Sequence, residues 1–130
     1  PQHPDARVGG LGGNETDVRL IGVDTPETVD PRRPVGCYGP EASAHTKQLL
    51  PEGTAVRLER DAELRDRYGR LLAYVRRASD GLLVNEDLLA GGYGEVLSIA
   101  PNTAFAGRFA GVERDARTAG VGLWSACPHE

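Results

Sequence analysis

The sequence predicts a single α+β domain, and two patterns support this fold class. Short apolar or alternating segments, typical of strands, are grouped early in the chain, while apolar residues at helical spacing predict three helices between and after these segments. The length of 130 residues fits one domain, and a hydrophobic content of 39% allows one lean core. No internal repeat divides the chain.

Three segments have the patterns of strands. Residues 19–23 form an apolar run after an arginine, residues 55–60 alternate apolar and charged side chains, and residues 71–77 form a second apolar run. Residues 96–99 form a brief apolar segment. Residues 1–13 contain two prolines and four glycines, which predicts either a frayed edge hairpin or a linker.

Helices are predicted at residues 39–50, 83–90 and 105–119. Pro40 and Glu41 suit the first turn of the first helix, because proline fixes a helical φ and a carboxylate favours the positive end of the helix dipole. Gly91 and Gly120 follow the other two helices as stop signals. One stripe of the last helix is apolar and contains Phe105, Phe109, Val112, Ala116 and Ala119.

The strand at residues 19–23 runs directly into Asp24-Thr25-Pro26-Glu27. Pro26 ends the strand, because it lacks an N–H donor and restricts the residue before it. Two carboxylates and a hydroxyl therefore leave the strand together, a few residues after Arg19. Such oxygen atoms suit a hard cation, a carboxylate can act as a general base, and an arginine can bind an anion.

The charge of the chain gives a mixed indication of its partners. A formal net charge of −4 argues weakly against a strong non-specific nucleic-acid binder. However, fourteen of the fifteen basic residues are arginine, whose planar fork matches phosphate geometry, so a few well-placed residues can outweigh the net charge locally. No apolar run is long enough for a membrane span, so we expect no membrane association.

The two cysteines, Cys37 and Cys127, either form a disulfide or remain as two unpaired buried thiols. A disulfide would close a loop of about ninety residues, which the chain-entropy model values at about 4 kcal/mol. It would also indicate an oxidising compartment and would hold the C-terminal tail against the segment before the first helix. We expect the disulfide.

Five ordered blocks together resemble the staphylococcal nuclease (thermonuclease) family. They lie at residues 19–27, 37–44, 66–74, 83–86 and 122–125, in the order and near the spacing of that family. The resemblance implies a five-stranded OB-fold β-barrel with three helices packed against it. It divides the chain into an N-terminal segment at residues 1–16 with complete or incomplete first strands, the nuclease-like domain at 17–127 and a tail at 128–130.

The resemblance also implies roles for individual residues. Glu27 would orient or deprotonate the attacking water, and Arg19 and Arg70 would stabilise the phosphoryl transition state. Calcium would be held by Asp24, Thr25 and Asp5, although Asp5 lacks the surrounding motif of the family. Substrate contacts would come from Arg67, Tyr68, Arg32 and Arg33. For Tyr68 a place in the core or at the rim is the alternative, and for the adjacent arginines a solvated surface.

From these residues we expect a calcium-dependent, sugar-nonspecific nuclease that cleaves DNA and RNA, single-stranded or locally melted, to 3′-phosphate products. We expect a monomer that is secreted or periplasmic, with no signal peptide in this chain. The segment at residues 96–100 lacks aromatic side chains, so base stacking, worth about 1 to 3 kcal/mol per base, would need another platform. The alternative is a nuclease-like module that binds nucleic acid or protein without cleavage; a digestion assay with calcium or chelator separates the two.

Overall fold

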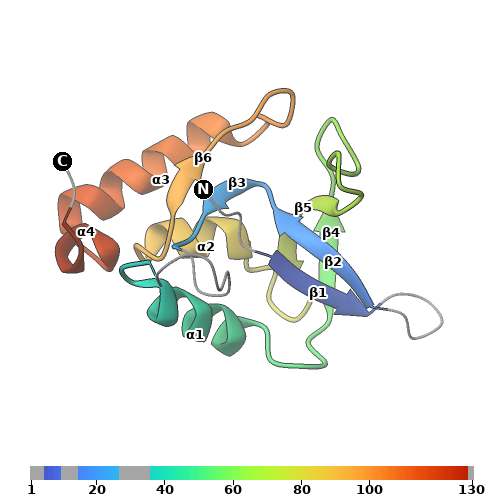
Figure 1. Cartoon of the computed structure of the whole chain (residues 1–130), viewed down its shortest axis with the longest axis horizontal. Coiled ribbons are helices and arrows are strands. Elements are labelled where there is room, and N and C mark those ends of the chain that lie inside the picture. Colours follow the sequence, from blue (N-terminus) through green and yellow to red (C-terminus); the bar gives the residue numbers. More distant parts are fainter. Residues whose placement is uncertain (1–4, 10–14, 27–35, 129–130) are drawn as a thin grey trace.

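The computed structural model describes the backbone of residues 5–9, 15–26 and 36–128, and side chains from residue 17 on. Within these residues the chain is an α+β domain, as predicted (Figure 1). Its elements in chain order are β1 (Asp5–Gly9), β2 (Glu15–Leu20), β3 (Gly22–Asp24), α1 (Gly39–Leu49), β4 (Val56–Glu59), β5 (Leu71–Arg77), α2 (Val84–Ala90), β6 (Glu95–Leu97), α3 (Ala106–Ala119) and α4 (Leu123–Ala126).

The described strands form two sheets. The larger sheet has the order β1-β2-β5-β4, in which β2 and β5 are parallel and the other neighbours antiparallel; the smaller sheet pairs β3 with β6. Only Ile21 separates β2 from β3, and Gly22 follows with a φ of 85°. A Cβ at Gly22 would lie 2.7 Å from the Phe109 ring, so a glycine lets this bend pack against α3. One bent strand thus serves both sheets.

The resemblance implies a five-stranded closed barrel, but the described strand pairings do not form one. If β2 and β3 count as one bent strand, five strands are present among the described residues, but their hydrogen bonds give two separate sheets. The expected number of helices also needs correction, because α4 is a fourth helix within the described residues. Its four residues are too few for a periodic apolar pattern, so the sequence did not indicate it.

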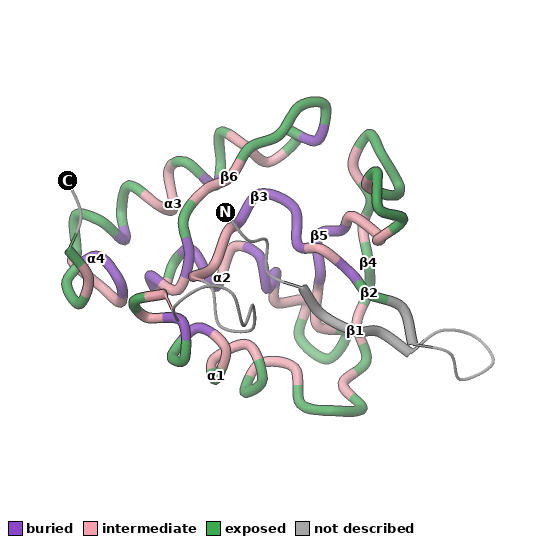
Figure 2. The backbone as a smooth tube through the Cα atoms, in the orientation of Figure 1, coloured by how far each residue is buried: buried purple, intermediate pink, exposed green. Residues whose placement is uncertain are grey.

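The core lies where the two sheets meet α2 and α3. Buried side chains of β2, β3, β5 and α2 form one cluster with Phe109 of α3, and Figure 2 shows these buried stretches in the middle of the fold. Of the stripe predicted on the last helix, Phe109 and Ala116 are buried, whereas Ala119 is exposed. A second cluster joins Ala116 to Trp124 of α4.

Asn85 is a fully buried polar residue at the start of α2. Its Oδ1 accepts the N–H of Val75 at 2.9 Å, and its Nδ2 donates to the carbonyl oxygens of Ile21 at 2.8 Å and Ala73 at 3.2 Å. Because a buried amide needs such partners, Asn85 fixes α2 against β5 and against the junction of β2 and β3.

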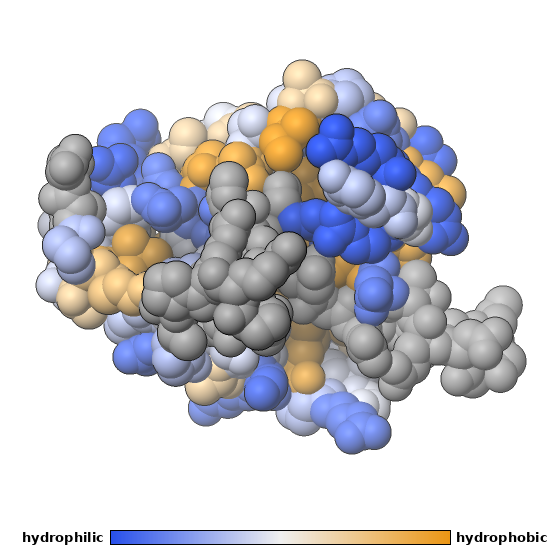
Figure 3. Space-filling view, in the orientation of Figure 1, coloured by the Kyte–Doolittle hydropathy of each residue, from blue (hydrophilic) through white to orange (hydrophobic). Residues whose placement is uncertain are grey.

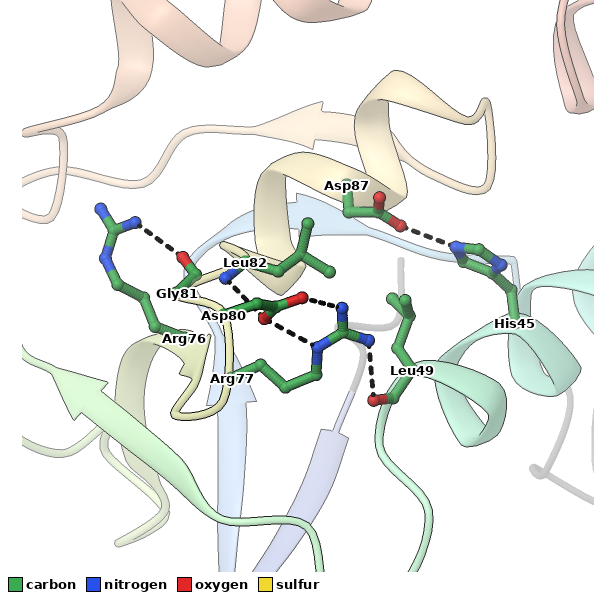
Figure 4. Close-up of polar contacts among 8 residues, drawn as sticks. All are labelled: His45, Leu49, Arg76, Arg77, Asp80, Gly81, Leu82 and Asp87. Atoms are coloured by element: carbon green, nitrogen blue, oxygen red, sulfur yellow. Dashed lines mark hydrogen bonds and ion pairs between the residues drawn. The ribbon is translucent and has the colours of Figure 1, made fainter.

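Polar side chains also tie α1 to the rest of the domain (Figure 4). His45 of α1 lies 2.7 Å from Asp87 of α2, and its ring stacks on Tyr93 with centroids 4.1 Å apart. Arg77 at the end of β5 pairs with Asp80 and donates to the carbonyl of Leu49. These contacts hold α1 beside α2 and the turn after β5.

A disulfide joins Cys37, just before α1, to Cys127, just after α4. It links segments that are 90 residues apart in sequence, with Cα atoms 5.9 Å apart. In the described part of the chain, none of the helices has the length and apolar character needed to cross a membrane.

Candidate functional site

A cleft of about 760 Å³ lies between the β4–β5 connection and the segment after β6. The junction of β2 and β3 contributes Arg19, Ile21 and Gly22 to its lining. Two reciprocal hydrogen bonds join its walls: the N–H of Glu63 donates to Asn102 Oδ1 at 2.9 Å, and Asn102 Nδ2 donates to Glu63 Oε1 at 3.0 Å. Figure 1 shows these two connections side by side, and Figure 3 shows hydrophilic side chains over the β4–β5 connection next to a hydrophobic patch.

Two arginines that are far apart in sequence meet in this cleft. Arg19 lies in β2 and Arg70 immediately before β5, and the parallel pairing of these strands brings them together. Arg70 Nε is 2.9 Å from Asp66 Oδ2, and Arg19 Nη1 is 3.8 Å from the same oxygen. The side chains are 12% (Arg19) and 26% (Arg70) exposed, so both cations are largely withdrawn from water at the bottom of the cleft. Such a pair is suited to bind an anion with several oxygens.

Asp66 organises the turn that precedes β5. Its Oδ1 accepts the backbone N–H groups of Tyr68 at 2.9 Å and Arg70 at 3.0 Å, and Gly69 takes a φ of 83° in the same turn. Burial of the Asp66 carboxyl opposes ionisation, but the hydrogen bonds from Arg70 and Tyr68 and the Arg70 charge outweigh it and lower the pKa of Asp66. The carboxylate is therefore ionised and holds the arginine pair.

Arg67 and Tyr68 lie at the rim of the cleft. Tyr68 is 68% exposed, and the guanidinium carbons of Arg67 and Arg70 lie 4.9 and 5.2 Å from its ring centroid. Of the alternatives open for Tyr68, a core position is therefore excluded, and the side chain presents an aromatic face beside two cations.

Asp24 and Thr25 line a neighbouring hollow of about 220 Å³ rather than the arginine cleft. Glu95, which is paired with Asp24 across β3 and β6, and the disulfide cysteines also line it. Gly22, at the edge of the arginine cleft, is two residues from Asp24, or roughly 7 Å along a strand. The oxygen donors and the arginines are thus adjacent but line separate cavities in the described part of the molecule.

Four predicted site residues lie wholly or partly outside the described atoms. Glu27, Arg32 and Arg33 fall outside the described residues. Asp5 is described as backbone only: it lies in β1, where it pairs with Arg19 of β2. Its strand therefore runs beside the strand that carries the first arginine.

Three polar residues in the cleft were missed as site residues from the sequence: Glu63, Asp66 and Asn102. For Asp66 a signal existed, because an aspartate followed three residues later by glycine is typical of a turn in which the carboxylate accepts backbone N–H groups. No comparable signal exists for Glu63 and Asn102, since their contact joins residues 39 apart in sequence.

An α+β domain with two partly buried arginines in an open cleft has the features expected of proteins that bind anionic groups such as phosphate. The sequence model of the family described as "Staphylococcal nuclease homologue" matches residues 17–126, and the chain belongs to this family.

Named relatives support the same family. The chain is 41% identical over 113 residues to "Thermonuclease" of Staphylococcus hyicus, covering 87% of this chain and 65% of that protein. It is 41% identical over 115 residues both to "SPbeta prophage-derived endonuclease YokF" and to "Endonuclease YncB" of Bacillus subtilis (strain 168), covering 87% of this chain and 38% and 53% of those proteins. The chain therefore spans less than two thirds of the length of these relatives.

Proposed function

We propose that the chain is a calcium-dependent nuclease that hydrolyses phosphodiester bonds of DNA and RNA without sugar specificity and leaves 3′-phosphate products. The observation that carries this proposal is the meeting of Arg19 and Arg70 at one carboxylate oxygen in one cleft. Two guanidinium groups placed in this way suit the oxygens of a single phosphate. The names of the thermonuclease and endonuclease relatives support the same reaction.

In this mechanism the arginines stabilise charge. Arg19 and Arg70 donate hydrogen bonds to phosphoryl oxygens whose negative charge grows as water attacks, and Glu27 orients that water or removes its proton. The new bond from the water oxygen to phosphorus replaces the bond to the 5′ oxygen, which leaves as a hydroxyl group after taking a proton from water. Arg67 and Tyr68 at the rim, with Arg32 and Arg33, contact neighbouring parts of the nucleic acid. Because all of these contacts are to the backbone or to the face of a base, little sequence preference is expected.

The proposed metal site consists of oxygen donors. Asp24 and Thr25 offer carboxylate, hydroxyl and carbonyl oxygens, which suit calcium rather than zinc or copper. Among the described residues no three acidic, histidine or cysteine side chains form a group that could hold a metal ion. We propose Asp5, which the family resemblance indicates and whose strand runs beside Arg19, as the further protein ligand. When bound, calcium would be held by these oxygens and would supply positive charge that offsets the negative charge of the phosphoryl group. A site with few protein ligands should bind calcium weakly without substrate.

We further propose that the preferred substrate is a single-stranded nucleic acid and that the active form is a monomer. The cleft combines arginines for phosphate with exposed Tyr68 and the apolar side chains Leu97 and Ile99 for bases, and a base can reach such a surface only when it is unpaired. The exposed disulfide cysteine supports an oxidising location outside the cytosol. The family match supports an OB-fold, in which the bent strand at β2 and β3 contributes to both sheets.

The test is digestion of single-stranded and duplex DNA and of RNA with calcium or with an excess of chelator. We expect cleavage only with calcium, fastest on single strands, with 3′-phosphate ends. The variant Arg70→Lys should lose roughly 100- to 1,000-fold in kcat, because an ammonium group cannot reproduce the bidentate geometry of arginine.

Arg108→Lys serves as the matched control, since Arg108 is 53% exposed and pairs with Glu86. It should leave the rate unchanged. If Arg70→Lys retains most of the activity, or if the chelator has no effect, the mechanism is wrong. If the chain binds single-stranded DNA but never cleaves it, the nuclease-like binding module is the correct alternative.

A further inference from the structure

Asp66 lies among the side chains of the cleft but has no chemical role in the mechanism above. Its two carboxylate oxygens make different contacts. Oδ1 accepts the backbone N–H groups of Tyr68 and Arg70, while Oδ2 faces the guanidinium groups of Arg19 and Arg70. One side chain thus shapes the turn and contacts both cations.

The backbone around Asp66 adds to this arrangement. The N–H of Asp66 donates to the carbonyl of Arg70 at 2.9 Å, and the N–H of Gly69 donates to the carbonyl of Asp66 at 3.1 Å. Together with the two bonds to Oδ1, these contacts fix both the backbone and the side chain of Arg70. A rigidly placed donor costs no reorganisation when charge develops on a substrate.

The same carboxylate offsets repulsion between the cations. Arg19 and Arg70 contact the same oxygen, so their nitrogen atoms can be no farther apart than the sum of the two contact distances, and both side chains are largely buried. Like charges at this separation repel unless an anion lies between them. Asp66 supplies that anion before any phosphate arrives, and a phosphate that enters the cleft meets a site partly neutralised by it.

We propose that Asp66 is a positioning residue with two opposite effects: it holds Arg19 and Arg70 ready for the transition state, and its charge weakens the binding of ground-state phosphate. This inference rests on the proposed nuclease function. Binding the ground state less tightly while orienting donors for the transition state favours kcat over tight binding.

The test is Asp66→Asn, which keeps an oxygen for the turn and removes the charge. We expect kcat on a single-stranded oligonucleotide with calcium to fall roughly 10- to 100-fold, because the arginines lose a charge-assisted partner. The KM should fall, and the affinity for the same oligonucleotide in chelator, measured by fluorescence anisotropy, should rise about 3- to 10-fold. If Asp66 had only a structural role, its replacement would lower kcat and would also lower the affinity for the oligonucleotide.

Asp80→Asn is the matched control. Asp80 also accepts an arginine Nε, that of Arg77 at 3.0 Å, and a backbone N–H, that of Leu82 at 3.1 Å, but it lies in the turn after β5 (Figure 4). The variant Asp80→Asn changes the net charge by the same amount as Asp66→Asn, but it should leave kcat and the affinity for the oligonucleotide unaltered. A gain in affinity with Asp80→Asn as large as with Asp66→Asn would mean that only overall charge matters, and would overturn the proposal.

Circular dichroism establishes that each variant is folded. If Asp66→Asn is unfolded, Asp66→Ser takes its place, because a hydroxyl can still accept a turn hydrogen bond. The proposal is overturned if the folded variant binds the oligonucleotide more weakly, if kcat is unchanged, or if both variants fail to fold. Binding in chelator separates this inference from the nuclease proposal. Tighter binding by Asp66→Asn in a chain that never cleaves would support the effect of Asp66 on ground-state phosphate alone, and would reject both the nuclease and the transition-state role of Asp66.

Discussion

Replacement of Asn85 by alanine should destabilise the domain severely. Asn85 is fully buried, and its side chain forms hydrogen bonds with three backbone groups. The carbonyl of Ala73 would keep a partner, because it also accepts the N–H of Ile21 at 3.0 Å. The N–H of Val75 and the carbonyl of Ile21 would lose their bond to this side chain.

The expected loss follows from these two groups. A buried backbone group that loses its partner costs about 1 to 3 kcal/mol, so Asn85→Ala should lower the free energy of unfolding by about 2 to 6 kcal/mol. This is a large part of the roughly 5 to 15 kcal/mol of a typical domain. The damage should extend to the arginine cleft, because Ile21 lines it.

Urea unfolding followed by the fluorescence of the single tryptophan, Trp124, measures the change. Asn85→Leu is the matched variant, since it removes the same hydrogen bonds but fills the space. If hydrogen bonding is the cause, leucine should not restore stability. A loss below about 1 kcal/mol for Asn85→Ala, or recovery with leucine, would refute this reasoning.

Two further predictions concern stability. Joint replacement of Cys37 and Cys127 by serine should lower the free energy of unfolding by about 4 kcal/mol, because the disulfide closes a long loop. Reduction of the unchanged protein should reproduce the loss. An equal melting temperature with and without reductant would contradict this prediction. The lowered pKa of Asp66 predicts that its ionised form stabilises the fold above the unfolded-state pKa of about 3.9 and that this contribution disappears as pH falls through the folded-state value. Urea unfolding between pH 3 and 7 should therefore show a stability gap between the unchanged protein and Asp66→Asn that shrinks on the acid side; a constant gap would be inconsistent with it.

Local patterns predicted much of the fold. The strand at residues 71–77 and the helix at 83–90 agree with β5 and α2 to within a residue, because apolar runs and glycine stop signals act over a few residues. Prediction failed where a local pattern was too short, as at α4, and where burial depends on distant partners, as at Ala119, which lies on the predicted apolar stripe but is exposed.

Local patterns could not predict how the strands pair into two sheets. The bend at Gly22 depends on the approach of Phe109 from α3, which is a contact between segments far apart in sequence. The two cysteines offered one possible intramolecular pairing, yet their position beside Asp24 and Thr25 became visible only in the folded chain.

The sequence by itself determined which chemical groups the protein carries: the two arginines, the oxygen-rich turn at Asp24 and the family to which the chain belongs. Only the tertiary structure decided that Arg19 and Arg70 share one carboxylate and that Asp24 lines the adjacent hollow. The reason is physical, because side-chain types follow from the order of residues, whereas the distance between two charges depends on how strands pair. Parallel pairing of β2 with β5 sets that distance, and it is a property of the whole fold.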